Sequence, residues 1–137
     1  HIVLRGGGGK TNFDATSVAE CEQQLLKNGI AANVMIDCSH ANSEKQHERQ
    51  VSVMSDVADQ IAAGNQSVIG FMVESHINSG NQKVPADKSQ LAYGVSITDA
   101  CVDWATTEKM IRDLRDTVKP VLASRSAPVL ESELKAG

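Results

Sequence analysis

The stretch Val34-Met35-Ile36-Asp37-Cys38-Ser39-His40-Ala41-Asn42 changes abruptly from apolar residues to small polar residues and a histidine. An apolar run of this length is typical of a strand buried in a parallel sheet, and the polar residues after it lie in the loop at the carboxyl end of the strand. The same change occurs three more times, where residues 2–4, 68–73 and 94–98 lead into Arg5, Glu74 and Asp99. The sequence therefore predicts an α/β fold with four parallel strands.

Ligands of α/β proteins usually bind at the carboxyl ends of the parallel strands, so we expect Arg5, His40, Glu74 and Asp99 to share one site. One neutral nitrogen donor and two carboxylates suit a divalent metal ion of the Mn, Fe, Co or Zn kind. No local spacing motif requires a metal, however. In the alternative interpretation, His40 and Asp99 cap the helices that follow them, and Glu74 pairs with a lysine or an arginine. His76 is a weaker ligand candidate because it lies beyond the expected strand end.

The glycine run before Lys10 and Thr11 is compatible with a phosphate-binding loop, because consecutive glycines let backbone N–H groups approach an anion. The Walker pattern would also need a glycine at position 4, where this sequence has Leu4. A turn between strand and helix is the simpler interpretation. A third possibility is that Arg5 and the nearby backbone bind a phosphate or carboxylate without a nucleotide.

Cys38 could form a nucleophilic pair with His40, since the two residues are close in sequence. No nearby cationic group would lower the pKa of the thiol, and a cysteine within a strand is usually a small buried residue. We therefore predict that Cys38 belongs to the core.

The composition excludes several classes of protein. The chain has 137 residues, of which 41% are hydrophobic, enough for one domain with a core. A net charge of −4 and four aromatic residues give no basic surface or stacking platform for nucleic acid. No apolar run approaches the ~20 residues of a membrane span. Three cysteines without a C-x-x-C pair favour a reducing compartment, and we expect the cytoplasm.

Helices are predicted at residues 14–28, 43–64 and 103–118. Ser43-Glu44-Lys45-Gln46 matches a capping box that would begin the second helix, and Pro120 would end the third. The faces that we expect to be buried are Val18, Cys21, Leu25 and Leu26 in the first helix, Val51, Met54, Val57, Ala58 and Ile61 in the second, and Met110, Ile111, Leu114 and Val118 in the third.

Residues 78–90 are rich in Gly, Asn, Lys and Ser and lack helical periodicity, so a long loop is predicted there, either functional or mobile. We divide the chain into a folded part, residues 1–118, and a C-terminal tail, residues 119–137, expected to fray or to pack against a partner. The chain also begins inside a predicted strand, which we interpret as the sign of a fragment.

Four stretches, in order, closely resemble the type I 3-deoxy-D-arabino-heptulosonate 7-phosphate (DAHP) synthases. They are Ile2-Val3-Leu4-Arg5-Gly6-Gly7, residues 34–43, Met72-Val73-Glu74-Ser75-His76 and residues 91–101. The resemblance extends to about Val118 and covers the C-terminal part of that enzyme. It implies a TIM (β/α)8 barrel, of which this chain would be the C-terminal half with the last four strands.

The resemblance also implies an activity: condensation of phosphoenolpyruvate with D-erythrose 4-phosphate to DAHP and phosphate, the first step of the shikimate pathway. By that similarity His40, Glu74 and Asp99 are three of four metal ligands, His40 and Asp99 are catalytic candidates, and Arg5 binds the phosphate of phosphoenolpyruvate. The fourth ligand, a cysteine, and a K-P-R-T-type motif lie upstream in the family and are absent here. The glycine run is longer than in the family, and Cys38 stands where Ser or Phe is common.

The expected partners are the two substrates, the N-terminal half of the same enzyme, and further copies in a homo-oligomer. Without the other half, we expect the barrel-facing side chains of Val34, Ile36, Val68 and Met72 to be exposed and to cause association. Two alternatives remain open. The chain could belong to a related metal-dependent aldolase-type phosphosugar synthase, or it could be an inactive structural fragment or one that contributes a half-site.

Overall fold

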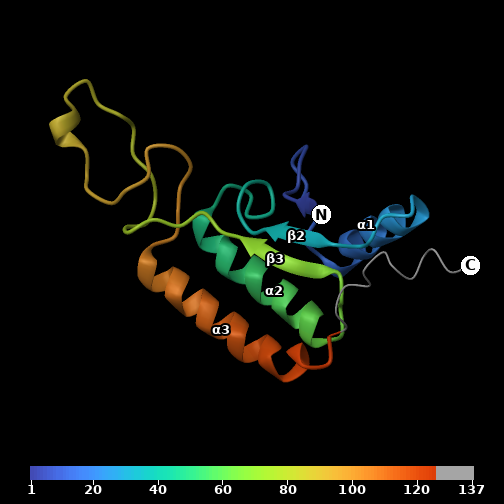
Figure 1. The fold of residues 1–137 in the computed structure, drawn as a ribbon. Helices are drawn as coiled ribbons and strands as arrows, with labels where there is room; N and C mark the ends of the chain where they lie inside the picture. Colours follow the sequence, from blue (N-terminus) through green and yellow to red (C-terminus); the bar gives the residue numbers. More distant parts are fainter. Residues whose placement is uncertain (126–137) are drawn as a thin grey trace, which may run out of the picture.

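The computed structural model describes residues 1–125, and its centre is a three-stranded parallel sheet (Figure 1). The strands β1 (Ile2–Leu4), β2 (Val34–Asp37) and β3 (Val68–Met72) lie side by side in this order. Leu4 is opposite Ile36, which in turn is opposite Phe71. Because the strands are parallel and in this register, their carboxyl ends meet at one edge of the sheet. The predicted α/β fold class with parallel strands is confirmed.

Two helices connect the strands and a third follows them. Helix α1 (Ala15–Lys27) lies between β1 and β2, α2 (Gln50–Ala62) lies between β2 and β3, and α3 (Trp104–Leu122) packs along α2 on one side of the sheet (Figure 1). Asp14 begins α1 by accepting a hydrogen bond from Ser17 N at 3.0 Å, a cap that typically contributes about 1 kcal/mol. Within residues 1–125, none of the helices combines the length and apolarity needed to cross a bilayer.

The core lies between the sheet and the helices, and it corrects one expectation. Val34, Ile36 and Val68 are buried, with at most 1% of their surface exposed. They were expected to face an open barrel interior, but they pack in the same cluster as the helix residues Val57 and Val18. The large apolar side chains that the sheet exposes are instead Ile2, Val3 and Ile69.

The buried faces of the helices are largely as predicted, with errors of one residue at their borders. Leu26, Val51 and Ile111 are exposed, contrary to the prediction. Consecutive helical residues are about 100° apart, so the neighbour of a buried residue can already face solvent. In α2 the buried face begins at Gln50 and Val53. The residues buried as predicted are Val18, Leu25, Met54, Val57, Ala58, Ile61, Met110 and Val118, while Cys21 and Leu114 pack against the core and are partly buried.

Two predicted helix ends are wrong. Ser43 does not begin a helix: its hydroxyl donates to the His40 carbonyl at 3.2 Å, and Glu44 and Lys45 have positive φ. The chain turns back there to close the loop after β2, so α2 begins only at Gln50, after the short 3-10 helix His47–Arg49. Helix α3 continues through Pro120 to Leu122. A proline near a helix end removes a single N–H donor, and water can satisfy the carbonyl left free at exposed Asp116.

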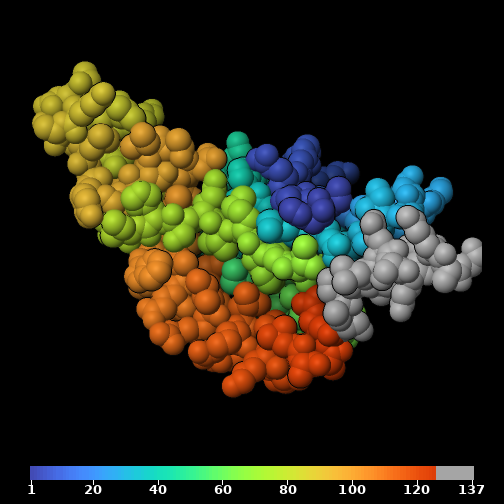
Figure 2. Space-filling model, viewed as in Figure 1, coloured from blue at the N-terminus to red at the C-terminus, as the bar shows by residue number. Residues whose placement is uncertain are grey.

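Residues 76–100 form an arm that projects from the sheet (Figures 1 and 2). The predicted strand at residues 94–98 is absent, and only isolated bridges occur there, such as Asn81 with Ser96. Side-chain amides replace a strand ladder: Gln82 Nε2 donates to Ala92 O at 2.8 Å and to Val95 O at 2.9 Å. The long loop predicted at residues 78–90 is part of this arm. Most of the predicted tail, residues 126–137, lies outside the described residues.

Candidate functional site

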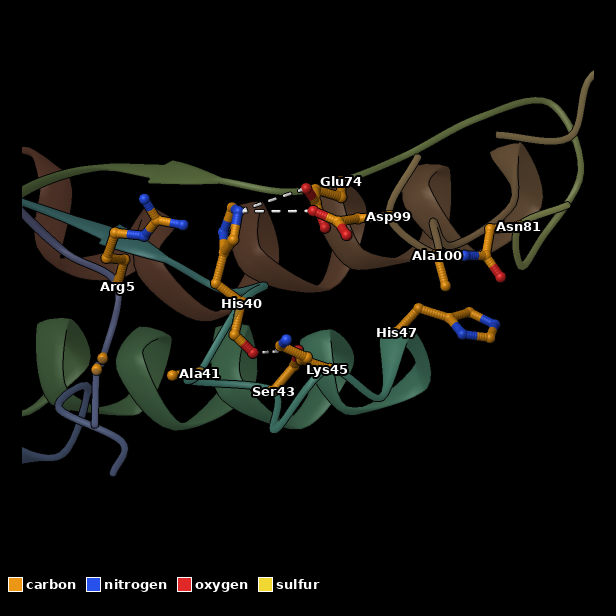
Figure 3. Close-up of a pocket in the computed structure, with 12 residues that line it drawn as sticks. Arg5, His40, Ala41, Ser43, Lys45, His47, Glu74, Asn81, Asp99 and Ala100 are labelled. Carbon is orange, nitrogen blue, oxygen red and sulfur yellow. Dashed lines mark hydrogen bonds and ion pairs between the residues drawn. The ribbon is translucent and has the colours of Figure 1, made fainter. Parts of the chain in front are cut away.

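A cavity of about 810 Å³ opens at the carboxyl edge of the sheet (Figure 3). Its walls come from the ends of β1 and β2, the segment after β3 and the end of the arm. The residues that line it are Arg5, Gly6, Gly7, His40, Ala41, Ser43, Lys45, His47, Glu74, Asn81, Asp99 and Ala100. All four side chains that were expected to share a site therefore line this cavity.

His40 is oriented by two buried neighbours. Its Nδ1 lies 2.7 Å from Asp37 Oδ2 and 2.8 Å from the Ser39 hydroxyl. The Ser39 hydroxyl and backbone N–H both donate to Asp37 Oδ1, at 2.7 and 2.8 Å. A carboxylate only accepts hydrogen bonds, so the imidazole proton lies on Nδ1 and the lone pair of Nε2 faces the cavity. His40 itself adopts φ +52°, which turns the ring back over the end of β2.

Two carboxylates face the free nitrogen of His40. Nε2 lies 3.7 Å from Glu74 Oε1 and 4.0 Å from Asp99 Oδ2 (Figure 3). One ligand atom from each of the three residues lies within 4.8 Å of the others. Two ligands that bind one ion at about 2.1 Å are separated by at most about 4.2 Å, so both distances to His40 suit a shared ion.

The surroundings of the three residues also suit a cation. Among residues 1–125, Glu74 and Asp99 form no ion pair with a lysine or an arginine. Helix α3 is capped by Asp103, which accepts from Thr106 N at 2.7 Å, so Asp99 does not serve as its cap. Burial raises the pKa of Glu74; the nearby His40 opposes this, and the charges of Asp99 and Asp37 add to it. Three acceptors that face one another, with no lysine or arginine paired to them among residues 1–125, fit a divalent ion of the predicted kind.

Arg5 lies at the other end of the cavity, across His40 from Glu74 and Asp99 in Figure 3. Among the described residues, no carboxylate lies within ion-pair distance of its guanidinium. The planar guanidinium can donate two parallel hydrogen bonds, which suits a phosphate or a carboxylate.

The backbone around Arg5 is held by two asparagine side chains. Asn42 is buried, and its Nδ2 donates to Leu4 O at 3.1 Å and to Asp37 O at 2.9 Å. Its Oδ1 accepts from Asn12 N at 2.8 Å, and Asn12 Oδ1 accepts from Gly6 N at 2.7 Å. Asn42 therefore connects the ends of β1 and β2, so that Arg5 and His40 keep a fixed separation.

The glycine run forms a turn and not a phosphate loop. Gly7 and Lys10 exchange two backbone hydrogen bonds of 3.0 Å, which close a tight turn. No helix begins directly after the run, because α1 starts only at Ala15. Gly6 is needed for a different reason: its φ is +67°, and a Cβ would lie 2.6 Å from Lys10 O. The turn interpretation is confirmed.

Two further candidates lie outside the cavity lining. Burial and the charge of Asp37 raise the pKa of Cys38 to about 12, and its side chain is inaccessible, so it is a core cysteine and not a nucleophile. His76 is exposed and accepts a hydrogen bond from Ile77 N at 2.9 Å. Sequence reasoning missed the roles of Asp37, Ser39, Asn42 and Gln50. The first three lie within the stretch that decided the fold, but their partners come from distant segments or from the conformation of the loop.

Three parallel strands that bring Arg5, His40 and Glu74 to one cavity, together with an arm that adds Asp99, define an α/β protein with a candidate metal centre and a nearby anion site. The chain belongs to the DAHP synthetase I family, whose family model matches residues 1–112.

Individual relatives agree with this assignment. The chain is 46% identical over 125 residues to a Tyr-sensitive phospho-2-dehydro-3-deoxyheptonate aldolase of Enterobacter agglomerans, covering 91% of this chain and 58% of the relative. It is 50% identical over 119 residues to the Phe-sensitive enzyme of Escherichia coli K12, covering 87% and 33% of the two chains. A solved structure of such an aldolase from Francisella tularensis matches with a TM-score of 0.81 at 43% identity, over 87% of this chain and 34% of the other. The chain thus spans about a third of the length of most of these relatives.

Proposed function

We propose that this chain supplies the C-terminal half of a (β/α)8 barrel in a DAHP synthase, a transferase that condenses phosphoenolpyruvate with D-erythrose 4-phosphate. The observation that carries the proposal is the arrangement of His40, Glu74 and Asp99 around one cavity opposite Arg5, in a chain of this family. His40 and Asp99 are the proposed catalytic residues.

The proposed metal ligands of this chain are His40 Nε2 and the carboxylates of Glu74 and Asp99. A divalent ion held there would supply Lewis-acid chemistry, which polarises the aldehyde of erythrose 4-phosphate. The hydrogen bond of His40 Nδ1 to Asp37 fixes the ring and the tautomer, so that Nε2 keeps its lone pair directed into the cavity. Glu74 supplies a partly buried carboxylate, with 24% of its side chain exposed.

Arg5 and Asp99 act at opposite ends of the cavity. The Arg5 fork holds the phosphate of phosphoenolpyruvate and thereby orients its enol carbon, which forms the new C–C bond with the aldehyde carbon. Water then adds to the adjacent carbon, which carries the phosphate oxygen. The bond from this carbon to that oxygen breaks, inorganic phosphate leaves, and the carbon becomes the keto group of the product. Asp99 has the more exposed of the two carboxylates, with 71% of its side chain exposed, and so we assign it the exchange of a proton with the aldehyde oxygen or with this water.

The sheet also supports a partner for the chain. Ile2, Val3 and Ile69 expose between 41% and 51% of their surface, and β1 and β3 are both edge strands within the described residues. Exposed apolar side chains beside unpaired strand edges favour association. The rest of a barrel would cover these side chains and pair with the two strand edges. Further copies of the enzyme would form a homo-oligomer.

The test is complementation. We would assay DAHP formation and phosphate release by the chain alone, by the separately produced N-terminal part of the Escherichia coli Phe-sensitive relative, and by the two together with Mn²⁺. Activity is expected only in the mixture, and His40→Ala should remove it. An active monomer of the chain alone would contradict the half-barrel, and turnover only with a different aldehyde in a substrate panel would contradict the proposed acceptor.

A further inference from the structure

Gln50 is the first residue of α2 and is completely buried. Its side-chain amide makes two hydrogen bonds to the backbone of a single residue, Glu74. Nε2 donates to Glu74 O at 3.1 Å, and Oε1 accepts from Glu74 N at 2.9 Å. Burying an amide is favourable only when its donor and acceptor both find partners, and here Glu74 satisfies both.

The two hydrogen bonds between Gln50 and Glu74 lie just beyond the end of the β2–β3 pairing. The pairing of β2 with β3 ends where Cys38 N donates to Met72 O at 2.9 Å, two residues before Glu74. Beyond that point the Gln50 amide takes the position of a neighbouring strand, because it offers one donor and one acceptor to the backbone. On the other side, Val102 N donates to the same Glu74 carbonyl at 3.0 Å.

This double attachment connects the three segments that carry the site. Gln50 joins Glu74 to the start of α2, only ten residues after His40, and Val102 joins it to the segment that contains Asp99. With its N–H and C=O both fixed, the Glu74 backbone has one orientation, which directs its carboxylate towards His40 Nε2 at 3.7 Å. A ligand that is fixed before the ion arrives needs no ordering when it binds.

We propose that Gln50 is a positioning residue for the metal site, and that its amide holds Glu74 so that the carboxylate meets His40 and Asp99. The proposal rests on the proposed function of these three residues as metal ligands. Gln50 does not line the cavity, so it acts only through Glu74.

The test compares Gln50 with a second glutamine of the same helix. Gln60 also uses its side-chain amide to bind a backbone group, donating to Phe13 O at 2.9 Å and to Asp56 Oδ1 at 2.7 Å, but it bonds to none of the three proposed ligands. Methionine has the same unbranched length as glutamine and no amide, so Gln50→Met and Gln60→Met remove the hydrogen bonds with little change in volume. Both variants should lose thermal stability, and only Gln50→Met should affect the site.

We would titrate the full chain and each variant with Co²⁺ and follow the affinity and the visible absorption of the bound ion. Gln50→Met is expected to bind at least about tenfold more weakly, with an altered spectrum, as for other groups that orient a ligand. Gln60→Met should match the unsubstituted chain. Should Gln50→Met not fold, Gln50→Asn and Gln60→Asn replace the pair; asparagine keeps an amide but is one methylene shorter, so it cannot hold both bonds to Glu74 at their present lengths, and a smaller loss of affinity is expected. Unchanged Co²⁺ affinity in a folded Gln50 variant overturns the proposal.

Hydrogen exchange of the Glu74 amide provides a second measurement that does not depend on the metal. Exchange should be faster in Gln50→Met than in Gln60→Met, because the Glu74 N–H has lost its acceptor. An unsubstituted chain that binds no Co²⁺ would refute the metal proposal itself and would be recognised before any variant is made. Equal Glu74 exchange rates in the two variants would overturn the positioning role, whether or not the metal binds.

Discussion

His40 and Asp99 follow the same sequence pattern, but the structure gives them opposite surroundings. His40 follows a real strand, β2, and its ring contacts Asp37 and Ser39, which are at most 2% exposed. Asp99 follows no strand, lies at the end of the arm, and exposes 71% of its side chain. The two side chains nevertheless approach to 4.0 Å.

The difference separates two ways of placing a functional side chain. His40 is held by its own loop, because its neighbours three and one positions earlier provide the acceptors for its Nδ1. Asp99 is placed by bonds to the backbone on either side of it: Gly80 pairs with Cys101, Val102 N donates to Glu74 O, and Asn81 Nδ2 donates to Thr98 O at 2.8 Å. We therefore expect the β2 side of the site to be rigid and the arm side to be adaptable.

The largest expected effect is a difference in alkylation rate between two cysteines beside the site. Cys38 lies two residues before His40, and Cys101 lies two residues after Asp99. Burial raises the pKa of both thiols, to about 12 for Cys38. Only the thiolate reacts, and a raised pKa lowers its fraction at every pH below that value. Relative to the ordinary value of 9.0, Cys38 should react about a thousandfold more slowly at pH 8.

Alkylation with iodoacetamide, followed by mass spectrometry of the two peptides, measures this difference. Cys101 should be modified first because the arm can open locally. The alkylation rate of an ordinary thiol levels off above about pH 9, whereas the alkylation rate of Cys38 should continue to rise with pH. Faster modification of Cys38 would show that the β2 end is not the rigid side.

The second prediction compares the two ligands directly. His40→Ala should weaken Co²⁺ binding about a hundredfold or more, since it removes the only nitrogen donor and the best-oriented ligand. Asp99→Ala should weaken it by about tenfold, because water can occupy the position of an exposed carboxylate oxygen. Calorimetric titration of both variants with Co²⁺ gives the ratio of the two losses in affinity. Equal losses would mean that the arm is as well ordered as β2 in solution.

The same contrast explains how much could be predicted from sequence. The alternation of apolar run and polar loop gave the strands β1, β2 and β3 and placed Arg5, His40 and Glu74 at one edge, because a strand and its carboxyl end are local features. The strand expected at residues 94–98 was wrong, because within residues 1–125 it finds no continuous neighbour, and a strand requires one. Asn42 and Gln50 were missed for a related reason: the backbone groups that they bind are distant in sequence, at Leu4 and Glu74.

The third prediction concerns the orientation of His40. Asp37→Ala should weaken Co²⁺ binding about 10- to 100-fold, because Nδ1 loses its charged partner and the ring its fixed orientation. Asp37→Asn keeps an oxygen that can accept from Nδ1–H and should restore part of the affinity. Circular dichroism would show that both variants are folded. Full affinity in Asp37→Ala would mean that Ser39 alone orients the ring.

The smallest expected effect is at Arg5, the third residue that a strand end positions. Arg5→Lys keeps the positive charge but loses the planar fork, so phosphoenolpyruvate should bind about tenfold more weakly, which corresponds to about 1.4 kcal/mol. Lys10→Gln, in the turn beside it, removes a whole charge without touching the cavity lining and serves as the matched control. Titration of phosphoenolpyruvate into the Mn²⁺-loaded complemented enzyme gives both affinities. If charge alone mattered, Lys10→Gln would weaken binding more than Arg5→Lys; a larger effect of Arg5→Lys would show that the site recognises the geometry of the phosphate.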